Sequence, residues 1–199
     1  MMRALAAAII LSLAAIPAAA QSMEVGAGAG FTFPVSLDRH AEELDGVRID
    51  GGFTFAVGAT RFLSDRWGIG VEWGQQFSGF SIDTGDATER LYDMGIGRFH
   101  GYAVYRFADA AARVRPFVFA GGGAKFLWAH DLGAETKPSL GFGGGLAYAL
   151  SRSLAIEGRA TYSPTLMNDG DAGNFCDAFG FCQSTLQQFE LLGGVRFRF

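Results

Sequence analysis

The chain has little proline and cysteine, no excess of basic charge and almost no long apolar runs. Only 5 prolines and 2 cysteines occur in 199 residues. Beyond the first twenty residues, no apolar stretch approaches the roughly 20 residues that a membrane-spanning helix needs. The 29 glycines follow no triplet repeat, which excludes collagen. The sequence also contains no low-complexity tract of the kind found in disordered proteins. Since 49% of the residues are hydrophobic, the apolar content must lie in short segments.

The N-terminal segment is the exception. Arg3 precedes a run of mostly Ala, Ile and Leu that ends at Pro17, and Ala18-Ala19-Ala20 forms an A-x-A cleavage site. This order is typical of a secretory signal peptide. We therefore expect residues 1–20 to be removed and residues 21–199 to form one domain.

The charge of the exported chain is modestly acidic. Without Arg3, 15 basic residues oppose 20 acidic ones, which gives a net charge of −5. Proteins that bind nucleic acid carry a basic face, so we expect no nucleic-acid partner.

The two cysteines lie close together near the C-terminal end. Export to an oxidising compartment would allow a disulfide between Cys176 and Cys182. No further cysteine or histidine lies near them, so we expect no metal site there.

Apolar residues alternate with small or charged residues in eight segments. At the C-terminal end, Phe199, Phe197 and Val195 share one parity, whereas Arg198 and Arg196 share the other. Strict alternation places the two sets on opposite faces of a strand. The strands predicted in this way cover residues 24–33, 50–61, 67–77, 91–107, 116–128, 139–150, 154–163 and 189–199. In segment 91–107 both parities carry large side chains, so its register stays open, and a bulge would change it.

The connections between these segments alternate in length. Short turns lie around Ser64, Ala111 and Arg152. The long connections cover residues 34–49, 79–90, 129–138 and 164–185. An even number of strands with short turns at one end and long loops at the other is typical of bacterial outer-membrane barrels, whose short turns face the periplasm. The predicted fold is all-β: an eight-stranded antiparallel transmembrane up-and-down barrel.

The alternation would also suit a soluble barrel that turns its apolar face inward. Two features favour the opposite orientation. Glycine is frequent on the polar face, which suits a narrow lumen, and aromatic residues such as Trp67, Tyr105 and Tyr148 lie near strand ends, as in an interfacial girdle. The lumen is then expected to contain the charged residues Glu72, Lys125, Glu157, Arg159, Glu190 and Arg196.

Charges inside a narrow barrel persist only when they are paired or hydrated. We therefore expect ion pairs in the lumen, with Glu157 and Arg196 on neighbouring strands as one pair. Glu24 and Arg198 lie at the predicted periplasmic mouth, where we expect water to solvate them.

The chain resembles the small outer-membrane β-barrel proteins of the OmpA/OmpX type, a porin-like β-barrel domain. The resemblance rests on the alanine-rich signal end, residues 116–123, the glycine-alternating segment from Gly141 and the terminal Phe197-Arg198-Phe199. It implies a place in the Gram-negative outer membrane, in contact with membrane lipid and lipopolysaccharide, and we expect a monomer. It also implies that Phe199, Phe197 and Val195 form the signal read by the barrel-assembly machinery.

The resemblance does not select a function, because this fold serves several. We predict a non-enzymatic protein of envelope structure or surface interaction, with no cofactor and no metal. The alternatives are a lipid A-modifying hydrolase and a narrow conduit for small apolar solutes. A hydrolase needs a serine activated by a histidine that a carboxylate orients. His40 and His130 fall in predicted loops and His100 in a predicted strand, and none stands two residues before a serine, so we predict no catalytic residues.

Overall fold

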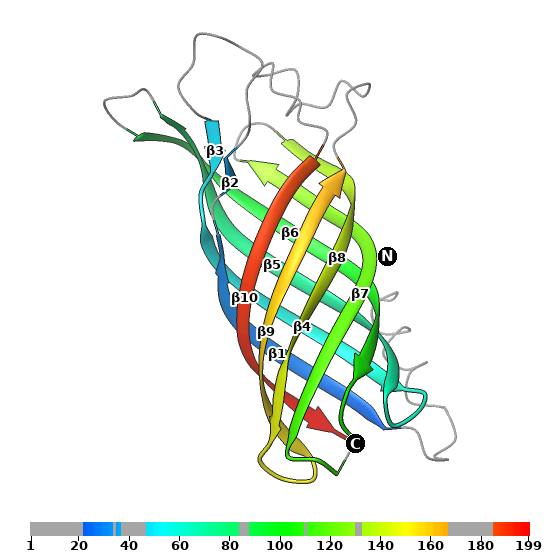
Figure 1. Ribbon diagram of the computed structural model, residues 1–199. Coiled ribbons are helices and arrows are strands. Elements are labelled where there is room, and N and C mark those ends of the chain that lie inside the picture. The colour runs from blue at the N-terminus through cyan, green and yellow to red at the C-terminus, as the bar shows by residue number, and fades with distance from the viewer. Residues whose placement is uncertain are drawn as a thin grey trace, which may run out of the picture.

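The computed structural model describes residues 22–33, 35–36, 47–83, 88–109, 111–129, 133–166 and 185–199, which form a closed antiparallel β-barrel (Figure 1). Eight strands close it: β1 (Met23–Thr32), β4 (Gly52–Phe62), β5 (Trp67–Asp83), β6 (Thr88–Arg106), β7 (Val114–Ala129), β8 (Gly133–Ala149), β9 (Leu154–Leu166) and β10 (Thr185–Arg198). Each strand pairs with the next, and β10 pairs with β1 from Glu24↔Arg198 to Thr32↔Glu190. The predicted fold class is confirmed.

Two short strands lie at one end of the barrel. β2 (Val35–Ser36) pairs with β3 (Val47–Ile49), and β3 pairs with residues 80–82 of β5. Within the described ranges, no helix is long and apolar enough to cross a membrane.

The distribution of side chains is the reverse of that in a water-soluble protein. Trp73, Phe142 and Phe197 point outward and are 39%, 44% and 50% exposed. Lys125 and Glu190 point into the lumen and are 2% and 4% exposed. Water around such an outer face would be strongly unfavourable, whereas hydrocarbon would not. The described strands therefore have the orientation that the alternation predicts for a membrane barrel.

Three short turns lie at one end of the barrel, which we call the short-turn end. In two of them a serine closes the turn: the hydroxyl of Ser64 accepts from the amide of Trp67 at 3.1 Å, and that of Ser151 accepts from Leu154 at 3.0 Å. The amide of Phe199 donates to the carbonyl of Met23 at 2.9 Å. The first and last barrel strands therefore meet at this same end.

The strands extend further than predicted at the opposite end, the long-connection end. The predicted loops 79–90 and 129–138 are wrong over most of their length, because β5 continues to Asp83, β6 starts at Thr88 and β8 starts at Gly133. Figure 1 shows the β5–β6 hairpin projecting beyond the barrel. Outside a bilayer a strand needs no apolar face, so the alternation stops while the hydrogen-bond ladder continues.

The structure resolves the register of β6. Phe99 and Phe107 point outward, whereas Tyr102 and Val104 point inward. The bulge in this region lies on β6: Phe80 pairs with Tyr92 and Ser81 with Arg90, so Leu91, the first residue of the segment whose register was open, is the extra residue.

Several predictions fall outside the described residues. These are the signal peptide at residues 1–20 and the features at His40, His130, Cys176 and Cys182.

Candidate functional site

The lumen is the most distinctive part of the barrel. At its short-turn end it contains a cluster of apolar side chains together with one arginine. Phe62, Val104 and Phe117 pack together there with Ala147. The guanidinium carbon of Arg106 lies 3.6 Å from the centre of the Phe62 ring.

Arg106 also donates to the carboxylate of Glu24. The expectation that Glu24 is solvated is wrong, because Glu24 is only 2% exposed. Its partner Arg106 could not be assigned to the lumen while the register of β6 was open. The pair neutralises two charges that would otherwise be costly to bury.

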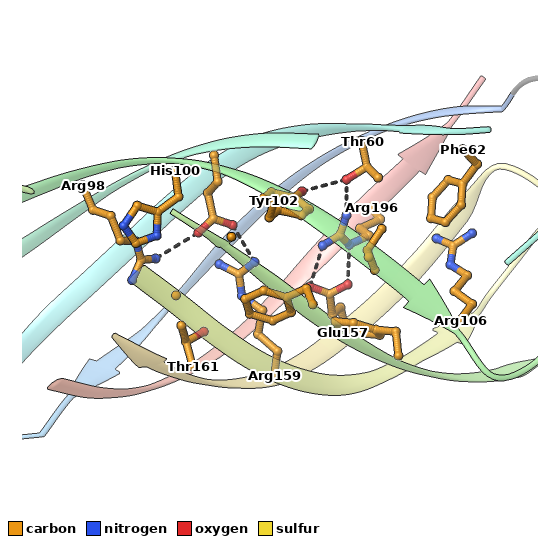
Figure 2. A pocket seen from close by; sticks show the side chains of 16 residues that line it. Thr60, Phe62, Arg98, His100, Tyr102, Arg106, Glu157, Arg159, Thr161 and Arg196 are labelled. Carbon is orange, nitrogen blue, oxygen red and sulfur yellow. Dashed lines mark hydrogen bonds and ion pairs between the residues drawn. The ribbon is translucent and has the colours of Figure 1, made fainter. Parts of the chain in front are cut away.

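The Arg196–Glu157 pair expected from the sequence forms inside the lumen. Both Nε and Nη2 of Arg196 donate to the Glu157 carboxylate, the latter at 3.0 Å. Nη1 of Arg196 donates to the Thr60 hydroxyl at 3.3 Å, and that hydroxyl lies 2.7 Å from the Tyr102 hydroxyl. Figure 2 shows these four side chains converging from four strands.

A second cluster of charges lies beside this pair. Arg98 donates to Glu72 at 2.9 Å and to Glu190 at 3.1 Å. Arg159 approaches the other oxygen of Glu72 at 2.5 Å. Two arginines and two carboxylates therefore neutralise one another across strands β5, β6, β9 and β10.

Lysines occupy the lumen towards the long-connection end. Lys125 donates to the side-chain oxygen of Gln188 at 2.6 Å and to the carbonyl of Ser163 at 3.0 Å. Lys137 lies 2.6 Å from Glu135. All six charged residues predicted for the lumen are therefore on the inward face and participate in polar contacts.

Sequence reasoning missed several lumen charges. Arg98 and Arg106 lie on β6, whose register was open, and Lys137 and Glu135 lie in a segment that was predicted to be a loop. Arg115 was missed for a third reason: the predicted segment begins at residue 116, whereas β7 begins at Val114. Extending the inward parity of neighbouring strands through these positions would have found them.

A histidine and a serine form a buried pair in the lumen. Nε2 of His100 lies 2.6 Å from the Ser139 hydroxyl, with exposed fractions of 6% and 2%. Among the described residues, no carboxylate is hydrogen-bonded to the other ring nitrogen, and no group of His, Cys, Asp and Glu is arranged to hold a metal ion. The pair therefore lacks the third member that orients a catalytic histidine.

Described residues of the lumen line small cavities, of which three are well formed. The space open to the centre of a water molecule is about 20, 30 and 20 Å³ in them. One water needs roughly 10–15 Å³ by this measure. Each of these cavities therefore has room for one or two particles of about the size of a water molecule or a small ion.

The three residues proposed as an assembly signal lie on the outer face of β10. Val195, Phe197 and Phe199 are exposed at 40%, 50% and 80%. Together they form an apolar row at the short-turn end of the strand that closes the barrel.

The fold is shared with outer-membrane barrels of known structure. Neisserial surface protein A, from Neisseria, is 16% identical with a TM-score of 0.64, covering 89% of this chain and 97% of that one. A major outer membrane protein from Thermus thermophilus is 17% identical with a TM-score of 0.63, covering 91% and 100%. The N-terminal barrel domain of Pseudomonas aeruginosa OprF is 14% identical with a TM-score of 0.53, covering 89% and 97%.

No curated protein shows significant similarity to the chain. The model of one protein family, described as the outer membrane protein beta-barrel domain, matches residues 4–181. With the closed barrel, the apolar outer face and the charged lumen, this match places the protein in the outer membrane. The chain belongs to the outer membrane protein beta-barrel domain family.

Proposed function

We propose that the protein is a non-catalytic outer-membrane barrel that contributes to envelope structure and interacts through the surface at its long-connection end. The observation that carries this proposal is the filled lumen. Ion pairs of Arg98, Arg159 and Arg196 cross the bore, and the cavities between the described side chains have room only for particles about as small as water. The similarity to a protein described as a surface protein supports the same class.

Two measurements, one on the refolded barrel and one on cells, test this proposal. In planar bilayers the refolded barrel should produce no discrete conductance steps, because ion pairs cross its lumen in the part that the structure describes. Lipid A from cells with and without the protein should give identical mass spectra. Discrete openings would support a conduit, and an altered acyl pattern would support an enzyme; either outcome would overturn the proposal.

The enzyme alternative has one specific observation in its favour, the His100–Ser139 pair. Both residues are buried inside the lumen, beyond the reach of an acyl chain in the surrounding lipid. A Ser139→Ala variant should therefore leave the lipid A spectrum unchanged, even when the protein is overproduced. The conduit for small apolar solutes is disfavoured because the lumen is lined with charged groups.

We also propose the partners of this barrel. Lipid contacts the outer face, lipopolysaccharide surrounds the long-connection end, and the assembly machinery reads Phe199, Phe197 and Val195 in a monomeric chain. Replacing Phe199 and Phe197 by Ala should lower the amount of protein that migrates faster on unboiled gels. The same replacements at Phe53 and Phe77, which are equally outward-facing, should lower it much less if the terminal position matters.

A further inference from the structure

Three cations face one another on neighbouring strands of the lumen. Arg98 on β6 is the register partner of Lys125 on β7, and Lys125 is the register partner of Lys137 on β8. Their exposed fractions are 7%, 2% and 5%. Like charges that lie directly opposite each other destabilise a sheet, and a buried charge needs a counter-charge. Each of the three therefore requires an anionic partner.

The two outer members of this row have carboxylate partners. Arg98 pairs with Glu72 and Glu190, and Lys137 pairs with Glu135.

Lys125, the central member, contacts only neutral oxygens, those of Gln188 and Ser163. Within the described strands, no carboxylate lies within ion-pair distance of its ammonium group. Glu72 is shared with Arg159, so four cations meet three carboxylates in this part of the lumen. One positive charge, at Lys125, is left without a counter-charge.

Two side-chain amides connect Lys125 to a buried donor that lacks an acceptor. The ammonium group can only donate, so it fixes the oxygen of Gln188 as acceptor. The Gln188 amide nitrogen then donates to the Gln76 side-chain oxygen at 2.9 Å. The amide nitrogen of Gln76 is left as a buried donor that has no acceptor among the described residues. Gln76 is 5% exposed.

Lys125, Gln188 and Gln76 line the same cavity, whose free space is about 20 Å³. That space suits one particle of the size of a water molecule. Glu190 also lines the cavity, but its charge is already engaged by two hydrogen bonds from Arg98. The unmatched groups at this cavity are therefore an ammonium group and an amide donor.

We propose that this cavity is a binding site for one small monovalent anion of the halide class, held by Lys125 and Gln76. The anion accepts from the Lys125 ammonium and from the Gln76 amide nitrogen, and it supplies the negative charge that the row of three cations lacks. Water has the right size but carries no charge, so it would satisfy Gln76 and leave Lys125 uncompensated. This site does not depend on the proposed function, since a bound anion is compatible with a conduit or an enzyme.

The test uses the refolded mature chain in detergent micelles. The midpoint of thermal unfolding, followed by the loss of fast mobility on unboiled gels, is compared in sodium chloride, sodium bromide and sodium gluconate at equal ionic strength. We expect both halides to raise the midpoint by several degrees over gluconate, with a saturating dependence on concentration, because a ligand that binds only the folded state stabilises it. Equal midpoints in all three salts would overturn the proposal.

Variants locate the effect. Lys125→Met and Gln76→Leu should each abolish or strongly weaken the halide dependence. Arg66→Gln removes a positive charge from an exposed turn and should leave it intact. A halide effect that survives in both lumen variants would place the anion elsewhere and contradict the proposal.

Crystals grown with bromide give a readout on the unaltered chain, which remains decisive if a lumen variant fails to fold. An anomalous peak within hydrogen-bond distance of Lys125 Nζ and Gln76 Nε2 is expected. A water molecule without anomalous signal at that position would refute the site.

Discussion

Single glycines allow neighbouring strands to lie close together, because they have no side chain to separate them. A Cβ added to Gly121 on β7 would lie 2.0 Å from the carbonyl oxygen of Gly101 on β6. That neighbour is backbone, so the two strands would have to move apart. Gly158, in contrast, has no atom within 4 Å of an added Cβ.

We therefore expect Gly121→Ala to destabilise the barrel by about 1–3 kcal/mol, the range typical of overpacking. Gly158→Ala, the matched control, should change the free energy of unfolding by less than about 0.5 kcal/mol. Urea unfolding in lipid vesicles, followed by tryptophan fluorescence, measures both. Equal effects of the two substitutions would contradict the role of close strand approach at Gly121.

The Arg196–Glu157 pair leads to a second prediction at the level of single residues. Arg196→Met leaves the Glu157 carboxylate buried without its cation, which should reduce the free energy of unfolding by about 3–5 kcal/mol. The double variant Arg196→Met/Glu157→Leu should recover much of this loss, because it removes both charges. Arg66→Gln, which breaks an exposed pair with Asp109, should leave the free energy of unfolding nearly unchanged, because water screens such a pair. No recovery in the double variant would mean that the pair contributes more than charge compensation.

The pairing of β6 changes along its length. It pairs with β5 from Thr88 to Tyr105 apart from the bulged residue Leu91, but with β7 only from Met94↔Ala129 to the short-turn end. Residues 88–93 therefore form the edge of a two-stranded hairpin, whereas residues 94–106 lie between two neighbours.

Amide hydrogen exchange should reveal this difference. We expect protected amides on both sides of β6 between residues 95 and 105, and fast exchange at alternate amides between residues 88 and 93, where no β7 partner lies opposite. Exchange followed by nuclear magnetic resonance in nanodiscs resolves individual positions. Uniform protection along all of β6 would contradict the projecting hairpin.

How well the sequence predicts the structure differs from strand to strand. Alternation identified every strand where it crosses the apolar layer, as in β8 with Leu140, Phe142 and Leu146 outward. It could not find the ends of β5, β6 and β8, because no apolar face is required there. It also left β6 ambiguous, because inward Tyr102 is as large and apolar as outward Phe99, and Arg98 and Arg106 were lost with that register. The Glu157–Arg196 pair was predictable because both strands have an unambiguous parity.

Over the whole molecule, the apolar outer face and the two unlike ends define an orientation in the membrane. The three short turns lie at one end, and the hairpin with its open edge lies at the other. Barrels of this architecture place their short turns in the periplasm, and we expect the same here.

Cysteine labelling in intact cells tests this orientation. In a chain carrying Cys176→Ser and Cys182→Ser, a thiol introduced by Asp93→Cys should react with a membrane-impermeant maleimide added from outside. A thiol introduced by Ser64→Cys should react only after the outer membrane is permeabilised. The reverse labelling pattern would mean that the barrel has the opposite membrane topology, with its short turns outside the cell.

The hydrogen bond between Phe199 and Met23 has a consequence for engineering. Since the two ends of the barrel sheet are adjacent at one rim, the order of strands around the ring is circular and has no structural beginning. A short linker could join these ends and the backbone could be reopened between β5 and β6, which would yield a circular permutant with the same ring of strands and its new termini on the opposite rim.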